Sequence, residues 1–149
     1  MTTIKPITNN RKAKFEYHLL ETFEAGIALL GSEVKSLREG RISLNEAFVV
    51  LKSSGAWLHQ AHIGEYKWAN INNHEPLRER QLLLNGHELL KLRRGTREKG
   101  MTIVPIKMYF KGSRVKLEIA LAKGKKLHDK RQAIKERETK RALARGRRD

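Results

Sequence analysis

The histidines are the first side chains in this sequence that could carry chemistry. His59 and His62 are spaced H-x-x-H, and His74 and His87 follow further along the chain. On an alternating strand His59 and His62 fall on opposite sides, and no Asp/Glu-rich cluster accompanies them, so a zinc site or a nuclease centre is disfavoured. The chain has no cysteine, which excludes disulfides, thiolate catalysis and Cys-based zinc sites. We therefore predict no metal, no cofactor and no enzymatic activity, with a basic nuclease as the most distant alternative.

A second set of residues has types that suit contact with RNA. Glu24 lies in an alternating segment, on the side opposite the apolar residues. A carboxylate there either faces solvent or accepts hydrogen bonds from base N–H groups, because carboxylates avoid phosphates. Tyr66, Trp68 and Tyr109 are candidates for stacking on bases.

The stretch Gly124-Lys125-Lys126 has residue types found in phosphate-binding loops. No Gly-x-x-x-x-Gly-Lys-Ser/Thr frame surrounds it, so an NTPase is not supported. His128 follows closely, and an exposed imidazole there can stack on a base and hydrogen-bond to a phosphate. A solvated polar residue is the simpler alternative for His128.

The charge of the chain favours a polyphosphate partner. The formal net charge is +16, from 32 Lys+Arg against 16 Asp+Glu. Residues 122–149 contain 12 Lys/Arg and 4 Asp/Glu, so this segment of +8 carries half of the net charge. A field of this sign and size favours nucleic acid over an ordinary solvated surface or an anionic membrane face. The polar N-terminus and the lack of an apolar run of about 18–20 residues lead us to expect a cytoplasmic protein.

The elements that must position these residues are mostly short strands. Period-two alternation, turn residues and cap residues predict strands at 15–19, 23–29, 47–51, 56–59, 101–110 and 114–123, short helices at 32–40 and 85–94, and an exposed loop at 64–80. Pro105 fits an edge or an irregular position, and Gly26 marks a bulge or a close backbone approach. The pattern predicts a mainly β fold with two or three short helices and a small closed barrel, of which the OB-fold is one member. Alternation alone does not separate it from other small barrels.

The chain divides at Ala122 into a body, residues 1–122, and a basic C-terminal tail, residues 123–149. In the tail only Leu127 and Ile134 could share an apolar helix face, and burying two residues gains roughly 3–6 kcal/mol. Ordering some 25 residues costs on the order of 1 kcal/mol each or more. We therefore expect the tail to be disordered when free and, because its residues are good helix formers, helical on a charged partner.

Five motifs stand out, at residues 10–13, 23–29, 31–38, 82–85 and, longest and most specific, at 122–131, Ala-Lys-Gly-Lys-Lys-Leu-His-Asp-Lys-Arg. With these motifs the chain resembles the small protein B family, the SsrA-binding proteins of bacterial trans-translation. The resemblance covers nearly the whole chain and weakens past Glu138. It implies an OB-fold barrel that binds the tRNA-like domain of transfer-messenger RNA (tmRNA). It also implies a tail in the decoding centre and empty messenger channel of the stalled 70S ribosome, and a non-enzymatic, monomeric adaptor.

The resemblance also implies roles for individual residues. The implied tmRNA-binding residues are Asn10, Arg11, Lys12, Glu24, Leu83 and Lys116. The implied ribosome-binding residues are Lys123, Gly124, Lys125, Lys126, His128, Asp129, Lys130 and Arg131. The competing interpretation is a basic OB-fold ribosomal or initiation-type protein that binds ribosomal RNA.

Overall fold

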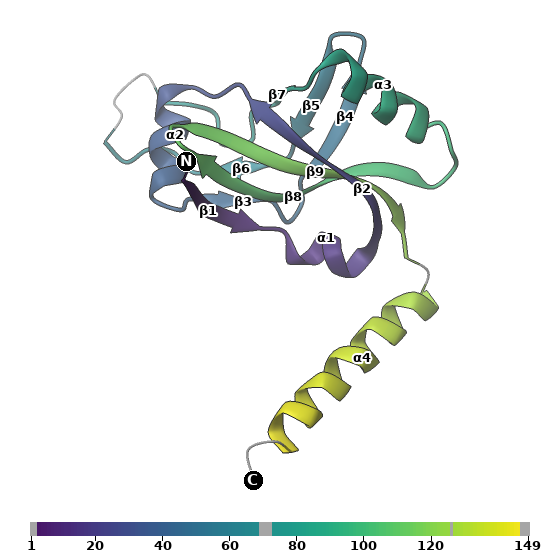
Figure 1. The fold of residues 1–149 in the computed structure, drawn as a ribbon. Coiled ribbons are helices and arrows are strands. Elements are labelled where there is room, and N and C mark those ends of the chain that lie inside the picture. Colours follow the sequence, from purple (N-terminus) through teal and green to yellow (C-terminus); the bar gives the residue numbers. More distant parts are fainter. Residues whose placement is uncertain (1–2, 69–72, 126, 147–149) are drawn as a thin grey trace.

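The computed structural model describes residues 3–68, 73–125 and 127–146. Figure 1 shows a β-rich body from which one long helix projects. The elements in chain order are β1 (Ile4–Asn9), α1 (Arg11–Glu16), β2 (Tyr17–Ile27), α2 (Gly31–Arg38), β3 (Ile42–Ser43), β4 (Phe48–Lys52), β5 (Gly55–His59), β6 (His62–Ile63), β7 (Arg80–Leu83), α3 (Gly86–Gly95), β8 (Met101–Lys111), β9 (Arg114–Gly124) and α4 (Leu127–Gly146).

Seven strands form one sheet in the order β1-β8-β9-β2-β7-β5-β4, and β3 pairs with β6. All of the pairings are antiparallel. The mainly β fold with a few short helices is therefore confirmed. No closed barrel is found: in the described part of the chain β4 approaches β8 across the core, but no hydrogen-bonded ladder joins β4 to β8 or to β1.

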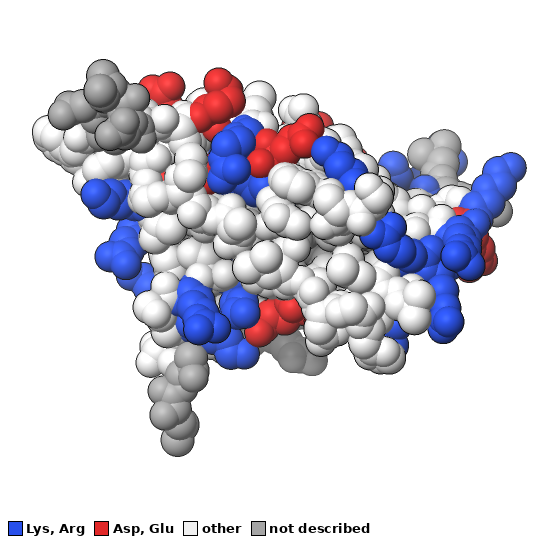
Figure 2. Space-filling view, turned by 90° about the horizontal axis from the view of Figure 1, so that it is seen from above, with Lys and Arg blue, Asp and Glu red and all other residues white. Residues whose placement is uncertain are grey.

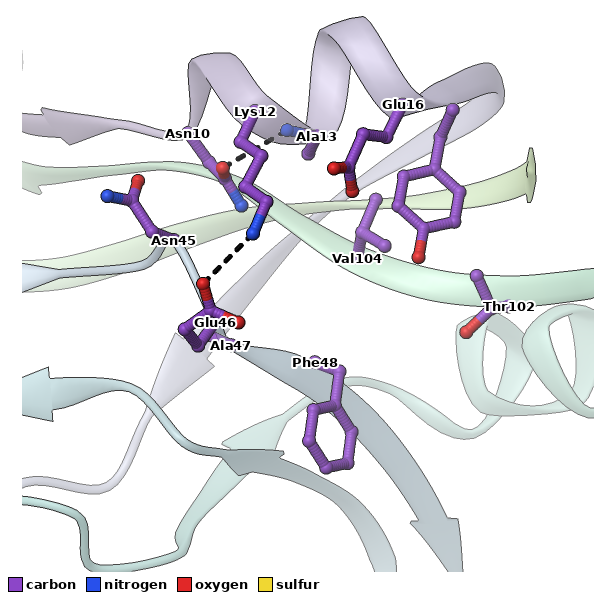
Figure 3. A pocket seen from close by; sticks show the side chains of 11 residues that line it. Asn10, Lys12, Ala13, Glu16, Asn45, Glu46, Ala47, Phe48, Thr102 and Val104 are labelled. Atoms are coloured by element: carbon purple, nitrogen blue, oxygen red, sulfur yellow. Dashed lines mark hydrogen bonds and ion pairs between the residues drawn. The ribbon is translucent and has the colours of Figure 1, made fainter. Parts of the chain in front are cut away.

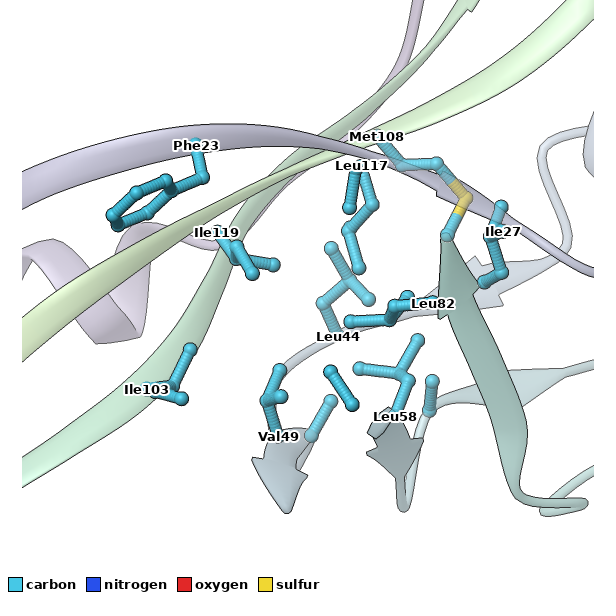
Figure 4. Close-up of a cluster of buried hydrophobic side chains, with 14 of the residues drawn as sticks. Phe23, Ile27, Leu44, Val49, Leu58, Leu82, Ile103, Met108, Leu117 and Ile119 are labelled. Atoms are coloured by element: carbon cyan, nitrogen blue, oxygen red, sulfur yellow. The ribbon is translucent and has the colours of Figure 1, made fainter. Parts of the chain in front are cut away.

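The core lies inside the curve of this sheet, because each long strand turns alternate side chains inward. On β9 the inward residues are Val115, Leu117 and Ile119, which are almost fully buried. They meet side chains from the other strands, including Val49 and Leu58 of the β4–β5 hairpin (Figure 4). Full burial of each large apolar side chain contributes about 1.5–3 kcal/mol, so this cluster dominates the stability of the body.

A smaller apolar cluster lies on the outer face of the sheet. There Ala13 of α1 packs against Val104, Ile106, Ala120 and Ala122. The predicted strand at 15–19 is confirmed for residues 17–19, which begin β2, and is wrong for residues 15 and 16, which belong to the short helix α1. Strand β1 was not predicted, since its side chains are mostly exposed and do not alternate in polarity.

Local chemistry explains the predictions that are confirmed. The Asn85 side chain caps α3 by accepting from the Glu88 N–H, and the Glu88 carboxylate accepts in return from the Asn85 N–H. Gly40 follows α2 with a φ of +73°, the left-handed conformation that glycine supplies at a helix end. The β4–β5 hairpin and the β8–β9 hairpin have their predicted turns. Pro105 lies in a register shift of β8, so its missing N–H interrupts no regular pairing.

The loop that begins at Gly64 is tied to the body through a buried ion pair. Glu33 of α2 and Arg80 of β7 both have side chains that are 0% exposed. The Glu33 carboxylate accepts hydrogen bonds from Arg78, Arg80 and the Leu30 N–H. Arg80 also donates to the carbonyls of Ala61 and Pro76, so the pair joins α2, β7 and the loop before it.

Helix α4 leaves the body after β9 and contacts α1, where the Arg137 guanidinium lies 5.7 Å from the centre of the Phe15 ring. Most of its described side chains are exposed. No helix in the described ranges has the length and apolar character needed to cross a membrane.

Candidate nucleic-acid interface

The outer face of β2, β9 and β8 is open beyond the end that α1 covers. In the register of the sheet, Lys116 of β9 lies between Gly26 of β2 and Tyr109 of β8. Gly26 also faces Leu83 of β7. Glu24, two residues before Gly26 on the same strand, points to the same outer side. The structure therefore brings Glu24, Leu83 and Lys116 together on what we call the open face.

A hollow of about 480 Å³ lies at the edge of the open face, lined by Gly26, Leu83, Arg114 and Lys116 and also by core-side residues such as Ile27 and Val115. Leu83 is 57% exposed, so an apolar side chain stands at the rim of a basic hollow. A Cβ at Gly26 would lie 3.2 Å from the Leu83 Cβ, which confirms the close approach predicted for this glycine. This arrangement offers an apolar contact next to two cations, which suits a nucleotide better than a purely charged partner.

Glu24 is held in place and held ionised by its neighbours. Its carboxylate accepts hydrogen bonds from the Tyr109 hydroxyl and, at 3.1 Å, from Lys111 Nζ. The Tyr109 bond, and then the Lys111 bond, lower the pKa of Glu24, and the charge of Lys116 acts in the same direction. At neutral pH Glu24 is therefore an acceptor only, half-exposed and free to take further hydrogen bonds from outside the protein.

Tyr109 does not have the exposure expected of a stacking platform. Its side chain is buried, and burial, followed by the bond to Glu24, raises the pKa of its hydroxyl. Tyr109 therefore positions Glu24. Trp68, by contrast, is 69% exposed, and Tyr66 lies under Lys35, whose Nζ is 5.5 Å from the ring centre.

Asn10 is inside the protein, although the resemblance implies a role for it in RNA binding. Its amide nitrogen donates to the carbonyls of Leu44 and Pro105. Its amide oxygen accepts from the Ala13 N–H (Figure 3). All of these groups belong to the protein, so Asn10 acts by starting α1 and fixing it on the sheet. Arg11, the next residue, is exposed.

Lys12 reaches from α1 toward the chain before β4. Its Nζ lies 2.9 Å from Glu46 Oε1 across a hollow of about 160 Å³ (Figure 3). The hydrogen bond and charge of Glu46 raise the pKa of Lys12. Both side chains are largely exposed, so Lys12 can exchange this partner for a phosphate at little cost.

The tail begins beside α1 and not beside the open face. Lys123 pairs with His18, and Gly124 pairs with Tyr17 at the end of α1. The Lys125 N–H donates to the Glu16 carbonyl at 2.8 Å, so the chain is held to the body through residue 125. We call Lys123, Gly124 and Lys125 the tail root.

The remaining predicted residues lie beyond the tail root. Lys126 lies outside the described residues. His128 and Asp129 belong to α4, but their side chains lie outside what the structure describes. Lys130 is half-buried and Arg131 is exposed.

Sequence reasoning missed Lys111 as a member of the open face. The signal was present in the hairpin turn, because a turn at Gly112-Ser113 sets Lys111 opposite Arg114 and Tyr109 opposite Lys116. Extending that register would have placed both partners of Glu24 near Lys116. Among the described residues, no group of three or more His, Asp or Glu side chains is arranged to hold a metal ion.

Comparison with known proteins finds relatives over most of the chain. The family model described as SmpB protein matches residues 7–149. An SsrA-binding protein of Aquifex aeolicus (strain VF5) is 52% identical over 143 residues, which is 95% of this chain and 91% of that protein. An SsrA-binding protein of Trichodesmium erythraeum (strain IMS101) is 50% identical over 142 residues, again 95% of this chain and 91% of that protein.

A solved structure is also similar. It is described as "tmRNA-SmpB: a journey to the center of the bacterial ribosome", and one of its chains superposes with a TM-score of 0.69 at 40% sequence identity. The match covers 85% of this chain and 93% of that chain. On these matches, this chain belongs to the SmpB protein family.

Proposed function

We propose that this chain is a non-enzymatic adaptor that binds tmRNA and acts with it in trans-translation on the 70S ribosome. The observation that carries the proposal is family membership over residues 7–149, together with relatives that are named SsrA-binding proteins. The similar chain of the tmRNA–SmpB ribosome structure supports the same partners. The tRNA-like domain of tmRNA is the part we assign to the body.

The open face is the surface we assign to tmRNA. Ionised Glu24 can accept hydrogen bonds from base N–H groups but repels phosphate, so it contributes selectivity. Lys116 and Arg114 can meet the phosphates beside such a base, and Leu83 can lie against a base or sugar. Because strands β2, β7, β8 and β9 hold these residues, binding orders few side chains. Asn10 supports tmRNA binding through the position of α1, and Arg11 and Lys12 supply charge there.

The body, residues 1–122, is the unit we assign to the OB-fold class. Its bent antiparallel sheet encloses one core, and OB-folds bind oligonucleotides on such a sheet face. The tail, residues 123–149, is the unit we assign to the ribosome. Lys123, Gly124, Lys125, Lys126, His128, Asp129, Lys130 and Arg131 would lie along the decoding centre and the messenger channel.

The composition of α4 suits folding on RNA. Its described side chains are mostly exposed, and Arg137 over Phe15 is its closest link to α1. A helix with so little buried surface gains its order from a charged partner and is disordered in the free protein. A tail that pairs with phosphates folds in an empty messenger channel but not where messenger already lies, and so it senses a stalled ribosome that lacks codons.

The substitution Glu24→Ala tests the assignment of the open face. We expect affinity for tmRNA to fall about tenfold to a hundredfold, the range for losing a charged hydrogen-bond acceptor at an interface. Gel-shift titration with tmRNA measures it. The matched control is Glu21→Ala on the same strand, whose carboxylate contacts Lys91 of α3 and not the Tyr109 and Lys111 partners of Glu24. Equal affinities of the two variants would remove the open face from the proposal. Failure of the unsubstituted chain to shift tmRNA would remove the function itself.

A further inference from the structure

Helix α3 carries a line of basic side chains that the open face and the tail do not include. Its inner side is fixed by Leu92, which is fully buried, and by Arg93, which donates to the Lys52 carbonyl at 2.7 Å. On its outer side Lys91 and Arg94 are exposed. Arg97 and Lys99 continue the line past the helix end, in the connection to β8, and both are exposed.

Three of these cations are not neutralised by the protein. Lys91 has an acidic partner, because its Nζ lies 3.4 Å from Glu21 Oε1. Arg94, Arg97 and Lys99, in contrast, form no hydrogen bond or ion pair through their side chains within the described ranges, and Glu98 is the one acidic residue among them in sequence. We call Arg94, Arg97 and Lys99 the α3 ridge.

Stabilisation of the helix end accounts for Arg94 but not for Arg97 and Lys99 of the α3 ridge. A cation in the last turn of a helix interacts favourably with the helix dipole, and Arg93 and Arg94 already fill that turn. Because the effect falls off within one turn, Arg97 and Lys99 gain little from it. Three uncompensated cations within six residues instead repel one another, and an anionic partner would relieve that repulsion.

The α3 ridge lies at the same end of the body as the tail root. Gly95 packs against Leu121, since a Cβ at this position would overlap the Leu121 side chain. Met101, two residues after Lys99, pairs directly with Lys123. Figure 1 shows the end of α3 and its connection to β8 beside the strand end from which α4 departs. Figure 2 shows Lys and Arg side chains gathered at that end of the molecule.

The open face is further away. Glu24 pairs with Glu118, five residues before Lys123 on β9, and at about 3.4 Å per residue this is about 17 Å. The ridge therefore extends the basic surface of the tail root sideways across the body, and it does not extend the open face.

We propose that the α3 ridge binds phosphates of ribosomal RNA beside the RNA that the tail root meets. The inference rests on the proposed function, because it takes the ribosome as the partner of the tail. It adds a third binding surface, which would hold the body against the ribosome and would set the direction in which α4 enters. The chemistry is that of phosphate binding by exposed guanidinium and ammonium groups, without reading of bases.

The triple substitution Arg94→Gln, Arg97→Gln and Lys99→Gln in the full chain tests the ridge. The matched control removes the same charge from three exposed lysines at the α2 end of the body, as Lys5→Gln, Lys35→Gln and Lys67→Gln. Binding of each protein to purified ribosomes that carry a truncated messenger is measured at several salt concentrations. Gel shifts with tmRNA are run in parallel, and thermal melts confirm that both variants fold.

We expect the ridge variant to bind ribosomes on the order of tenfold to a hundredfold more weakly than the control variant. The slope of log affinity against log salt should become shallower by about two to three, about one for each phosphate that the variant no longer neutralises. Affinity for tmRNA should match that of the control. A ridge variant that binds ribosomes as well as the control variant overturns the proposal. So does a ridge variant whose affinity for tmRNA falls as much as its affinity for ribosomes. If the unsubstituted chain shifts no tmRNA but the ridge variant still binds ribosomes more weakly, the ridge stands and the proposed function fails.

Discussion

A chain that ends at Lys125 is expected to bind tmRNA nearly as well as the full chain and to support no tagging of nascent chains on stalled ribosomes. The cut is placed after residue 125 because the Lys125 N–H still donates to the Glu16 carbonyl and Gly124 still pairs with Tyr17. A cut at Ala122 would also remove the end of the β2–β9 ladder and disturb α1. The open face lies on strands that this truncation leaves intact.

Loss of tagging follows from where the tail charge is. The deleted segment, residues 126–149, includes Lys126, His128, Asp129, Lys130 and Arg131 and the whole of α4. Without these residues the body can still carry tmRNA, but the chain has no tail that could fold into a helix in the messenger channel. A fall in tmRNA affinity as large as the fall in tagging would contradict this division of roles.

A shuffled tail is the control for charge. It keeps the composition of residues 126–149 and therefore the long-range field that attracts any RNA. If the position of each side chain along α4 matters, the shuffled chain tags no better than the truncated one. If tagging returns, charge alone carries the function, and the assignment of individual tail residues is wrong. Tagging is read by the appearance of tagged product in a reconstituted translation reaction, and tmRNA binding by gel shift.

Local signals in the sequence predicted those elements whose causes are local. The Asn85–Glu88 capping box, the turn at Gly112-Ser113 and the alternation of Val115, Leu117 and Ile119 each act within a few residues. For the same reason α1 was missed: its cap is Asn10, but the side chain that makes the helix stable, Ala13, is buried against β8 and β9, and α1 has too few residues to show a period. Alternation likewise predicts strands but not the register and shear that would decide whether the sheet closes.

The candidate site shows the same division between local and long-range causes. Glu24 faces away from Phe23, so alternation placed it on an outer surface. Residue type suggests exposure for an asparagine in a basic cluster. The Asn10 side chain is instead buried and donates hydrogen bonds to carbonyls 34 and 95 residues away in sequence. Tyr109 reaches Glu24 across 85 residues. Contacts between residues so far apart in sequence depend on how the strands pair in the completed sheet. They cannot be predicted from a single sequence when the register of the strands is unknown.

The substitution Glu33→Gln is expected to reduce the free energy of unfolding by about 3–5 kcal/mol at neutral pH, the cost of leaving a buried charge without its partner. Arg80 is 0% exposed and would keep its charge, with only the carbonyls of Ala61 and Pro76 and a neutral amide as acceptors. Urea unfolding measures the change. Glu39→Gln is the control, since Glu39 on the same side of the body pairs with Arg41 at 3.2 Å on the surface, where such pairs contribute about 0–1 kcal/mol.

The pH dependence of stability identifies the charge of Glu33 as the cause. Burial acts to raise the pKa of Glu33, but the hydrogen bonds from Arg78, the Leu30 N–H and Arg80 lower it by more, so it lies below its usual value. The unfolded chain, with a Glu pKa of about 4.3, then binds this proton more readily than the folded chain. The contribution of Glu33 is therefore complete above about pH 4.3 and is lost as the pH falls toward the folded pKa. We expect the unsubstituted chain to lose stability on acidification more steeply than Glu33→Gln, so that the two curves converge. Parallel curves would mean that the carboxylate acts through packing alone, and that α2 and β7 are held together by shape and not by this ion pair.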